Sequence, residues 1–389
     1  MKSSRGWRTL ALAAASTFAA VATMPVSAQV YQASVFASGL NNPRGLAFGP
    51  DGGLYIAEGG FYVPGPVTIP TGEGEATAGK TGSITQVLGG VQSPFLTGIT
   101  SFAGLSGSAT GPQDIAFYNG EGYVVLGLGA NPAARTAETA DLGGLYKFTA
   151  SGLTLVADLA GFEGANNPAG DQVDSNPFHL AAGPGGLYVT DAGGNSLLKV
   201  TDAGVVSAIT TFDDVPNLLF PGMGPPSSDP VPTGVALGPD GKLYVSELTG
   251  FPFTPGASTI FAVDPVTGVK TPFLTGLTTI TDIAFDAEGT LYVLQIAEDG
   301  LLGGGPGSIK RVNSDSSRTS IYSGVVMPAG VESGAKGDFY VTNFSPVPGI
   351  GQGLRIAAVP GPASWAMMIL GLGLAGMAMR RRTVSVRFA

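Results

Sequence analysis

The amino-acid sequence predicts an all-β protein, a six-bladed β-propeller, and three observations lead to this fold. The chain has 389 residues, of which 61 are glycine and 29 are proline, and only 12% are charged. This composition argues against both a disordered chain and a helical one. A hairpin motif recurs six times. The beginning of the repeat region also supplies a strand that its end lacks, as the closure of a ring requires.

The first 28 residues have the three parts of a secretory signal peptide. The basic residues, the uncharged run and the small-residue end are, in order, Lys2, Arg5 and Arg8, residues 9–22, and Val26-Ser27-Ala28. An end of this kind predicts cleavage between Ala28 and Gln29. The alternative is a retained membrane helix, which the small-residue end disfavours.

The recurring motif is a short apolar strand, an Asp-Gly turn and a second strand that carries a tyrosine. Residues 43–56 and 232–245 show it most clearly, and the pattern is typical of a β-hairpin. Another pair of strands follows each hairpin, which gives four strands, a to d, in each blade. The last three motifs are 48 residues apart, within the range of roughly 40 to 50 residues for propeller blades. The six motifs are marked by Tyr55, Tyr123, Tyr188, Tyr244, Tyr292 and Tyr340.

The sixth motif has no fourth strand before the tail of the chain begins. Residues 32–38 resemble the fourth strand of the first motif, residues 94–99. We therefore expect residues 32–38 to form the outer strand of the blade that holds Tyr340 and Ile356. The propeller domain is predicted to span residues 29–358.

The tail, residues 359–389, combines an apolar run with a basic end. Residues 363–379 carry no charge, and 17 residues is the lower limit for crossing a hydrocarbon layer of roughly 30 Å. Arginines after such a run are expected on the cytoplasmic side, so the propeller would lie outside the inner membrane. These arginines are Arg380, Arg381 and Arg382.

The same tail resembles the PEP-CTERM sorting signal of Gram-negative bacteria. The resemblance is carried by Pro360, Pro362 and Trp365, by the apolar run and by the arginines, with Gly361 where that family has a glutamate. It implies export across the inner membrane, recognition by an exosortase-type sorting machinery, and a mature protein that is membrane-anchored, at the cell surface or extracellular.

The repeat region resembles a further family, ScyD/ScyE, which is related to the NHL-type propellers. The segments that carry this resemblance are residues 41–46, 174–178, 191–195 and 247–253. The resemblance implies an extracytoplasmic location, and the family brings no settled activity with it.

Charge and cysteine content exclude two classes of function. The chain has no cysteine, which excludes thiol chemistry. Removal of residues 1–28 and 361–389 would leave 12 basic and 28 acidic residues. A protein with this excess of negative charge is not expected to bind nucleic acid.

The loops of the predicted blades differ strongly between the two faces of the ring. Turns from strand a to b and from c to d are short and share one face, the short-turn face. Loops from b to c and from d to the next a share the other, the long-loop face, and contain insertions at residues 59–82, 127–143, 161–176 and 213–232. Functional groups are often on loops of a rigid scaffold, so we expect function at the long-loop face.

Two rings of equivalent positions supply candidate site residues. The start of strand a has Asp114, His179 and Asp282, alternating with Gly45, Gly234 and Gly330. The end of strand b has Glu58, Asp191 and Glu247, with Gln295 and Asn343 in later blades. Both rings are expected at the channel rim on the long-loop face. They could hold Ca²⁺, which takes roughly 6 to 8 oxygen ligands, or provide a general base.

A structural role for these polar residues is the leading alternative. Repeated acids can cap loop amides and join blades by hydrogen bonds. The shared Asp-Ile-Ala-Phe sequence of residues 114–117 and 282–285 predicts such a contact for Asp114 and Asp282.

No motif specific to a known class of enzyme occurs in the chain. The leading interpretation is therefore a non-enzymatic binding module for an exopolysaccharide or a surface protein. The alternative is an extracytoplasmic, metal-dependent hydrolase or lactonase similar to the gluconolactonase-type propellers. A metal site would require Asp114, His179, Asp282 or their neighbours to converge.

Overall fold

The computed structural model describes residues 30–71, 74–220 and 225–359, and residues 372, 373 and 376 of the tail. Residues Val30–Val359 form one compact unit. The expected signal peptide with its cleavage site at Ala28 and Gln29 lies outside the described residues, as do Pro360, Pro362, Trp365 and Arg380 to Arg382. No helix of the described segments is long and apolar enough to cross a membrane.

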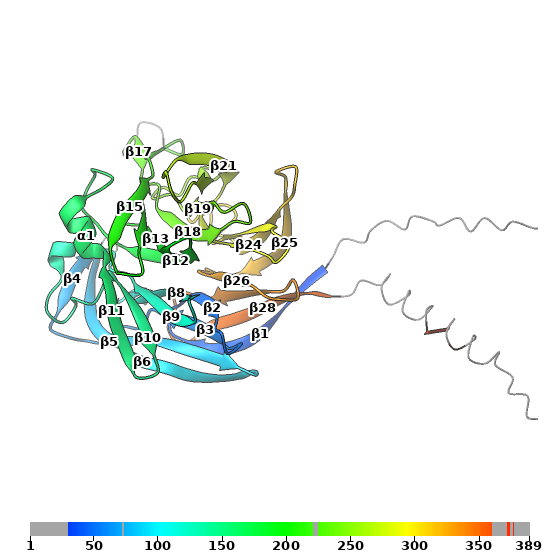
Figure 1. Cartoon of the computed structure of the whole chain (residues 1–389), viewed down its shortest axis with the longest axis horizontal. Coiled ribbons are helices and arrows are strands. Elements are labelled where there is room, and N and C mark those ends of the chain that lie inside the picture. Colours follow the sequence, from blue (N-terminus) through cyan, green and yellow to red (C-terminus); the bar gives the residue numbers. More distant parts are fainter. Residues whose placement is uncertain (1–29, 72–73, 221–224, 360–371, 374–375, 377–389) are drawn as a thin grey trace, which may run out of the picture. The chain divides into compact units, whose positions relative to one another are not determined.

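Six antiparallel sheets surround a central axis and form the predicted six-bladed β-propeller (Figure 1). The first strand of each blade contacts the first strand of the next, from β2 round to β26 and back to β2. The strands of blades 1 to 3, from the axis outward, are β2 (Pro43–Phe48), β3 (Leu54–Glu58), β5 (Gly74–Leu88) and β6 (Val91–Ala103); β8 (Pro112–Tyr118), β9 (Glu121–Leu126), β10 (Gly144–Thr149) and β11 (Gly152–Asp158); and β12 (Pro177–Gly183), β13 (Gly186–Asp191), β14 (Ser196–Val200) and β15 (Val206–Thr211). Those of blades 4 to 6 are β18 (Pro232–Leu237), β19 (Leu243–Glu247), β20 (Ser258–Val263) and β21 (Lys270–Leu277); β22 (Ile280–Phe285), β23 (Leu291–Gln295), β24 (Gly307–Val312) and β25 (Arg318–Val325); and β26 (Val331–Ser333), β27 (Phe339–Asn343), β28 (Gly351–Val359) and β1 (Val30–Leu40).

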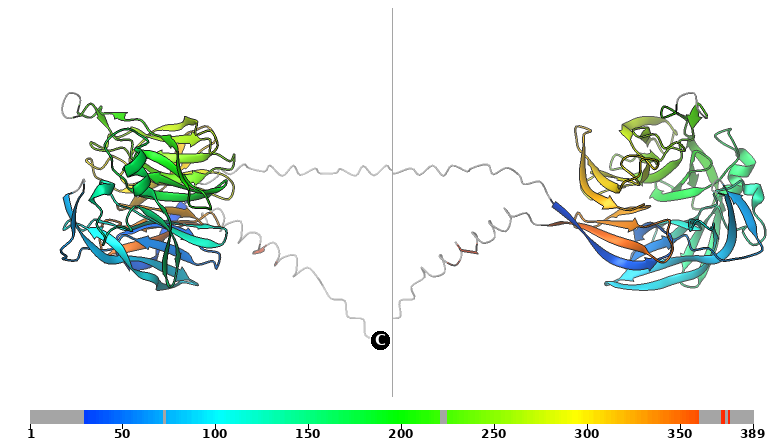
Figure 2. Two further views of the ribbon diagram at one scale, coloured as in Figure 1. Left: turned by 60° about the vertical axis from the view of Figure 1, so that its left-hand side comes forward. Right: turned by 180° about the vertical axis from the view of Figure 1, so that it is seen from behind.

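The ring is closed by the two ends of the propeller chain, as predicted. Strand β1 pairs antiparallel with β28, with Ala33 opposite Ile356 and Val35 opposite Leu354. Figure 2 shows β1 and β28 side by side in blade 6. The first and last strands thus occupy one sheet, so that neither leaves an unpaired inner edge in the ring.

The six repeated tyrosines all lie in the second strand of their blade, which confirms the repeat. Five of them are buried, and Tyr340 is partly buried. In two blades, the aspartate of the Asp-Gly turn accepts a hydrogen bond from the tyrosine hydroxyl. Tyr55 Oη donates to Asp51 Oδ2 at 3.1 Å, and Tyr244 Oη donates to Asp240 Oδ2 at 3.3 Å. A buried tyrosine usually requires such a partner.

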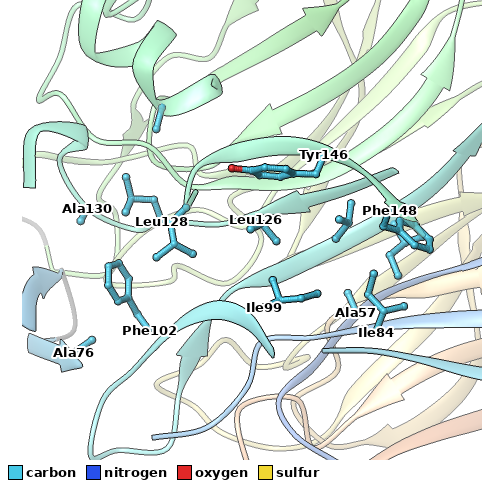
Figure 3. Packing of buried hydrophobic residues seen from close by; sticks show 14 of the residues in the cluster. Ala57, Ala76, Ile84, Ile99, Phe102, Leu126, Leu128, Ala130, Tyr146 and Phe148 are labelled. Carbon is cyan, nitrogen blue, oxygen red and sulfur yellow. The ribbon is translucent and has the colours of Figure 1, made fainter. Parts of the chain in front are cut away.

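Apolar side chains fill the space between neighbouring blades. Between blades 1 and 2, Ile84 and Ile99 meet Leu126 and Phe148 (Figure 3). Full burial of one such side chain stabilises the fold by roughly 1.5 to 3 kcal/mol. With no cysteine in the chain, the apolar layers and the sheet hydrogen bonds hold the ring together.

The insertions of the long-loop face have structure of their own. The longest extends β5 and β6 and adds β4 (Thr68–Thr71) and β7 (Ala109–Thr110). The others contain η1 (Pro132–Ala134), α1 (Leu159–Asn166) and the hairpin of β16 (Val215–Pro216) and β17 (Ser227–Ser228).

Helix α1 was expected to be a loop. It forms because Asp158 caps its N-terminus by accepting a hydrogen bond from the Gly161 N–H at 2.9 Å. Arg135 holds this cap in a bidentate ion pair, with Nη1 and Nη2 at 2.8 and 3.0 Å from the two carboxylate oxygens. The contact to a distant arginine, rather than local helix propensity, fixes this segment.

Candidate functional site

A β-bulge interrupts the start of the inner strand in five blades. Regular pairing to the second strand breaks between Pro112 and Asp114, between Pro177 and Leu180, and between Ile280 and Asp282, with equivalent breaks in blades 1 and 4. A bulge inserts an extra residue and redirects side chains. The bulge therefore sets the direction of the polar side chains at the start of these strands.

Three of the six predicted site residues come together at the axis. His179 Nδ1 lies 3.1 Å from Asp114 Oδ2 and 3.7 Å from Asp282 Oδ1. The exposed fractions of the three residues are only 4% to 6%. We refer to Asp114, His179 and Asp282 as the His–Asp cluster.

The two aspartates also join their blades to the next ones. Asp114 Oδ2 accepts a hydrogen bond from the Leu180 N–H at 2.9 Å, and Asp282 Oδ2 accepts one from the Val331 N–H at 2.8 Å. These are equivalent contacts, from blade 2 to 3 and from blade 5 to 6. The repeated contact predicted from the Asp-Ile-Ala-Phe sequences is confirmed.

The glycines of the same ring leave room for these carboxyl groups. A Cβ on Gly45 would lie 1.8 Å from Asp114 Oδ1, and one on Gly234 would lie 2.8 Å from the Asp282 Cα. A side chain at either position would collide with the aspartate of the next blade. Asp114 and Asp282 therefore each require a glycine at the equivalent position of the preceding blade.

The cluster keeps a buried positive charge between two carboxyl groups. Burial lowers the pKa of His179, but the carboxylates of Asp282 and Asp114 and a hydrogen bond to the Ala329 carbonyl outweigh burial and raise the pKa to about 9. Burial raises the pKa of Asp282 to about 6, against the attraction of His179. His179 is thus an imidazolium at neutral pH.

The donor set of the cluster does not fit a metal ion. The imidazolium already occupies the place between the carboxylates, and their oxygens accept backbone N–H groups. Within the described segments, no three acidic or histidine side chains are arranged so that they could hold a metal. The His–Asp cluster therefore does not fit the Ca²⁺ that the sequence suggested.

A cavity of about 320 Å³ leads along the channel to the cluster. Its walls are the later halves of the inner strands, from Asp114 to Phe117 and from Asp282 to Phe285. Since these strands end at the short a-to-b turns, the cavity extends toward the short-turn face. The sequence predicts access from the long-loop face, but Asp114, His179 and Asp282 at the bulged strand starts are buried.

One further acidic residue of this cavity was missed by the sequence analysis. Glu332 lies on β26, half-buried in the cavity wall. Burial, together with the carboxylates of Asp282 and Asp114, raises its pKa to about 8. The signal was present in the repeats, because the other five inner strands have alanine at this position: Ala47, Ala116, Ala181, Ala236 and Ala284.

The acids at the ends of the second strands do not join the cluster. Glu58 Oε2 accepts a hydrogen bond from the Asn41 N–H at 2.6 Å, and Asp191 Oδ1 accepts one from the Asn176 N–H, also at 2.6 Å. Each holds the chain that enters the inner strand of its own blade. They are structural caps of the kind the alternative interpretation described.

Glu247, at the equivalent position of blade 4, is also buried. Burial raises its pKa to about 8, although Lys270 and a hydrogen bond from the Thr259 backbone oppose this shift. Glu247 does not line the cavity.

Comparison with known proteins identifies the fold. No family model matches the chain, and no curated protein sequence is detectably similar to it. A gluconolactonase from Xanthomonas campestris has a TM-score of 0.51 and 13% identity, covering 85% of this chain and 90% of that one. A protein described as a putative oxidoreductase (glucose dehydrogenase), from Thermus thermophilus, has a TM-score of 0.51 and 19% identity, covering 84% of this chain and 100% of that one.

A third solved structure of this shape is the PQQ-bound aldose sugar dehydrogenase from Streptomyces coelicolor. Its TM-score is 0.51 and its identity 14%, and the match covers 85% of this chain and 98% of that one. At such low identity, these likenesses show the six-bladed β-propeller fold.

Proposed function

We propose that the protein is an exported hydrolase that opens a small sugar-derived lactone or a related ester in its central cavity. The observation that carries this proposal is the pairing of two carboxyl groups in one cavity, Glu332 with a pKa of about 8 and Asp282 with a pKa of about 6. Environments that separate two pKa values are typical of acid and base partners.

The reaction uses both groups near neutral pH. Ionised Asp282 takes a proton from water as the water oxygen bonds to the lactone carbonyl carbon. The bond from that carbon to the ring oxygen then breaks, and protonated Glu332 gives its proton to the leaving oxygen. Asp282 returns the proton it gained to Glu332 through solvent, so that lactone and water yield a hydroxy acid. The positive charge of His179 stabilises the developing oxyanion.

The size and lining of the cavity support a small ligand. Its volume of about 320 Å³ lies at the lower end of the range for small-molecule sites, roughly 300 to 1,000 Å³. Alanines and the aromatic ends Phe48, Phe117 and Phe285 surround a few carboxyl groups. The gluconolactonase and sugar dehydrogenases of similar shape support sugar derivatives as the substrate class.

The test is hydrolysis of a panel of five- and six-membered aldonolactones by the purified protein. The rate is measured by titrating the released acid at constant pH. We expect turnover above the spontaneous rate for at least one lactone, and competition by the corresponding sugar. Absence of turnover across the panel, with no sugar or lactone bound in equilibrium dialysis, would overturn the proposal.

A second candidate, the binding module, is favoured by an aromatic surface on the long-loop face. The rings of Phe220 and Phe251 stack with centroids 6.5 Å apart, and Phe253 lies 6.1 Å from Phe251. Phe251 is 61% exposed. Exposed aromatic faces suit the apolar faces of sugar rings, which supports an exopolysaccharide partner over a surface protein. Retention on immobilised exopolysaccharide that Phe251→Ala abolishes would support this candidate, and equal retention of both proteins would reject it.

We further propose the location and processing that the two ends of the chain indicate. The domain would be exported after cleavage behind Ala28, and residues 359–389 would engage an exosortase-type sorting machinery and the inner membrane of a Gram-negative bacterium. The sequence features of the two ends support this proposal.

A further inference from the structure

A second pocket, of about 560 Å³, lies between blades 4 and 5 on the short-turn face. It is lined by the a-to-b turns of both blades, by β21, by the end of β22 and by the turn from β24 to β25. We refer to it as the blade 4–5 pocket. Asp114, His179, Asp282 and Glu332 line the central cavity and not this pocket. Its volume is within the range for small-molecule sites, roughly 300 to 1,000 Å³.

Three aromatic rings form one wall of the pocket. Tyr244 contacts Phe273 and Phe285 edge to face, with ring centroids 4.9 and 5.0 Å apart. Phe273 is 42% exposed. Exposed rings in a concave, largely apolar wall are typical of a small-molecule site.

The interface of blades 1 and 2 contains the same three rings. Tyr55, Phe95 and Phe117 are the equivalent residues, and both phenylalanines stand in segments identical to those of the pocket, Pro-Phe-Leu-Thr-Gly and Asp-Ile-Ala-Phe. The ring centroid of Tyr55 lies 5.0 Å from that of Phe95 and 5.1 Å from that of Phe117. The two walls therefore have nearly the same geometry.

A fourth ring packs against this wall in blades 1 and 2. The ring centroid of Phe148 lies 5.9 Å from that of Tyr55 and 5.8 Å from those of Phe95 and Phe117. Phe148 is 5% exposed. The protein itself thus shows that a phenyl ring fits against a wall of this kind.

Other side chains stand at the equivalent place in blade 5. Phe148 follows the residue that pairs with the repeated tyrosine of its blade, and Val312 has this position in blade 5. The ring of Phe148 also requires Gly122, since a Cβ there would lie 2.5 Å from Phe148 Cζ. Blade 5 has Leu291 in place of this glycine. Val312 and Leu291 both line the pocket, so space for a ligand remains beside them.

The exposed ring distinguishes the pocket from two similar interfaces. Blades 6 and 1 combine Tyr340, Phe36 and Phe48 with Val87. In that interface Phe36 is half-buried, as is its equivalent in blades 1 and 2. Of the three equivalent phenylalanines, the one in the blade 4–5 pocket is accessible from solvent.

The rim of the pocket offers hydroxyl groups to a ligand. The side-chain hydroxyls of Thr290, Ser314 and Ser316 have no hydrogen-bond partner among the described residues. Ser314 and Ser316 are exposed. A ligand whose ring lies on the aromatic wall can therefore exchange hydrogen bonds with the rim through a hydroxyl group of its own.

The charged residues of the pocket already have partners. Asp240 accepts hydrogen bonds from the Tyr244 hydroxyl and the Lys242 N–H. Arg311 Nε donates to Asn313 Oδ1 at 3.1 Å. An uncharged ligand leaves these contacts intact.

We propose that the blade 4–5 pocket binds an uncharged molecule with one aromatic ring and a hydroxyl group, of the phenol or benzyl alcohol type. The ring lies against Tyr244, Phe273 and Phe285, as Phe148 lies against the equivalent wall, and the hydroxyl group reaches the rim. The inference rests on the comparison of blades and does not depend on the proposed lactone hydrolysis.

The experiment measures binding of phenol and of benzyl alcohol to the full-length protein by titration with saturation-transfer NMR. Leu291→Gly combined with Val312→Phe gives blade 5 the pair that blade 2 has. The matched control is the same exchange in blade 3, Leu187→Gly with Val200→Phe, because these two residues pair beside the repeated tyrosine in the same way. Cyclohexylmethanol tests the need for an aromatic ring, and an aldonolactone tests competition from the central cavity.

We expect both aromatic probes to bind the wild type and the control variant, and to bind the blade 5 variant at least about tenfold more weakly. Melting curves show whether each variant is folded. If the blade 5 variant does not fold, Phe273→Ser, a change of an exposed residue, replaces it with the same expected loss. No binding to the wild type, equal affinity of the blade 5 variant, equal binding of cyclohexylmethanol, or displacement by the lactone would overturn the proposal.

Discussion

Glu332 and Tyr340 face each other across β26 and β27, at the one position where the other five blades pair an alanine with the repeated tyrosine. The repeat thus shows that a methyl group suffices for the fold at this position. A carboxyl group there is a specific addition to the cavity of blade 6. Burial disfavours the charged form of this carboxyl group and raises the pKa of Glu332 to about 8.

Glu332→Ala is therefore expected to separate activity from stability. Lactone hydrolysis should fall at least about 100-fold, the usual lower size of a general acid–base contribution. The melting temperature should stay the same or rise, because alanine occupies this position in five blades and a half-buried carboxyl group is removed. Rates at several pH values and a melting curve provide the measurement. Unchanged hydrolysis would remove Glu332 from the mechanism.

The raised pKa values in the channel predict a protein that is less stable in alkaline solution. The pKa of His179 rises from 6.5 to about 9 on folding. Its protonation therefore stabilises the fold fully below about pH 6.5, and this contribution is lost as the pH rises toward 9. Glu332 acts with the same sign between about pH 4.5 and 8, because the folded protein retains a proton that the unfolded chain releases.

We expect the melting temperature to fall between about pH 6.5 and 9, and to fall less over about pH 5 to 8 in Glu332→Ala. Melting curves at constant ionic strength test both statements. A wild-type melting temperature that rises through this range would show that His179 is not held as an imidazolium.

Gly45→Ala tests the close packing of blade 1 against blade 2. The new Cβ would lie 1.8 Å from Asp114 Oδ1 and would push that carboxyl group from its contacts with His179 and Leu180. Overpacking of this kind costs about 1 to 3 kcal/mol, so the free energy of unfolding in urea should fall by at least this amount. Gly104→Ala is the control, since its new Cβ would meet nothing closer than 3.5 Å. Equal stability of the two variants would refute the packing argument.

Processing of the chain ends provides a separate prediction. Mature protein from a bacterial host should begin at Gln29, as N-terminal sequencing can show. Replacement of Arg380, Arg381 and Arg382 by alanine should change retention in the membrane fraction, because the basic stop after the apolar run is lost. An unaltered distribution of the triple variant between membrane, surface and medium would speak against the sorting tail.

The fold was accessible from the sequence because its signals are local and repeated. The tyrosine after each turn predicts a hairpin wherever it occurs, and six copies predict six blades. The position of residues 32–38 against Ile356 followed from a count of strands, since a closed ring leaves one strand to be supplied by the other end. Helix α1 was missed because its cap depends on Arg135, which lies 23 residues before Asp158.

The sequence by itself determined the ring, the repeated contact of Asp114 and Asp282, and the excess of acidic groups. Only the tertiary structure decided which of these groups meet. It brought His179 between two aspartates from other blades and left Glu58 and Asp191 as caps. It also buried the Glu163 carboxyl group with no hydrogen-bond partner among the described residues. The physical reason is that hairpins arise from neighbours in the chain, whereas the charge state and accessibility of a carboxyl group depend on every blade packed around it.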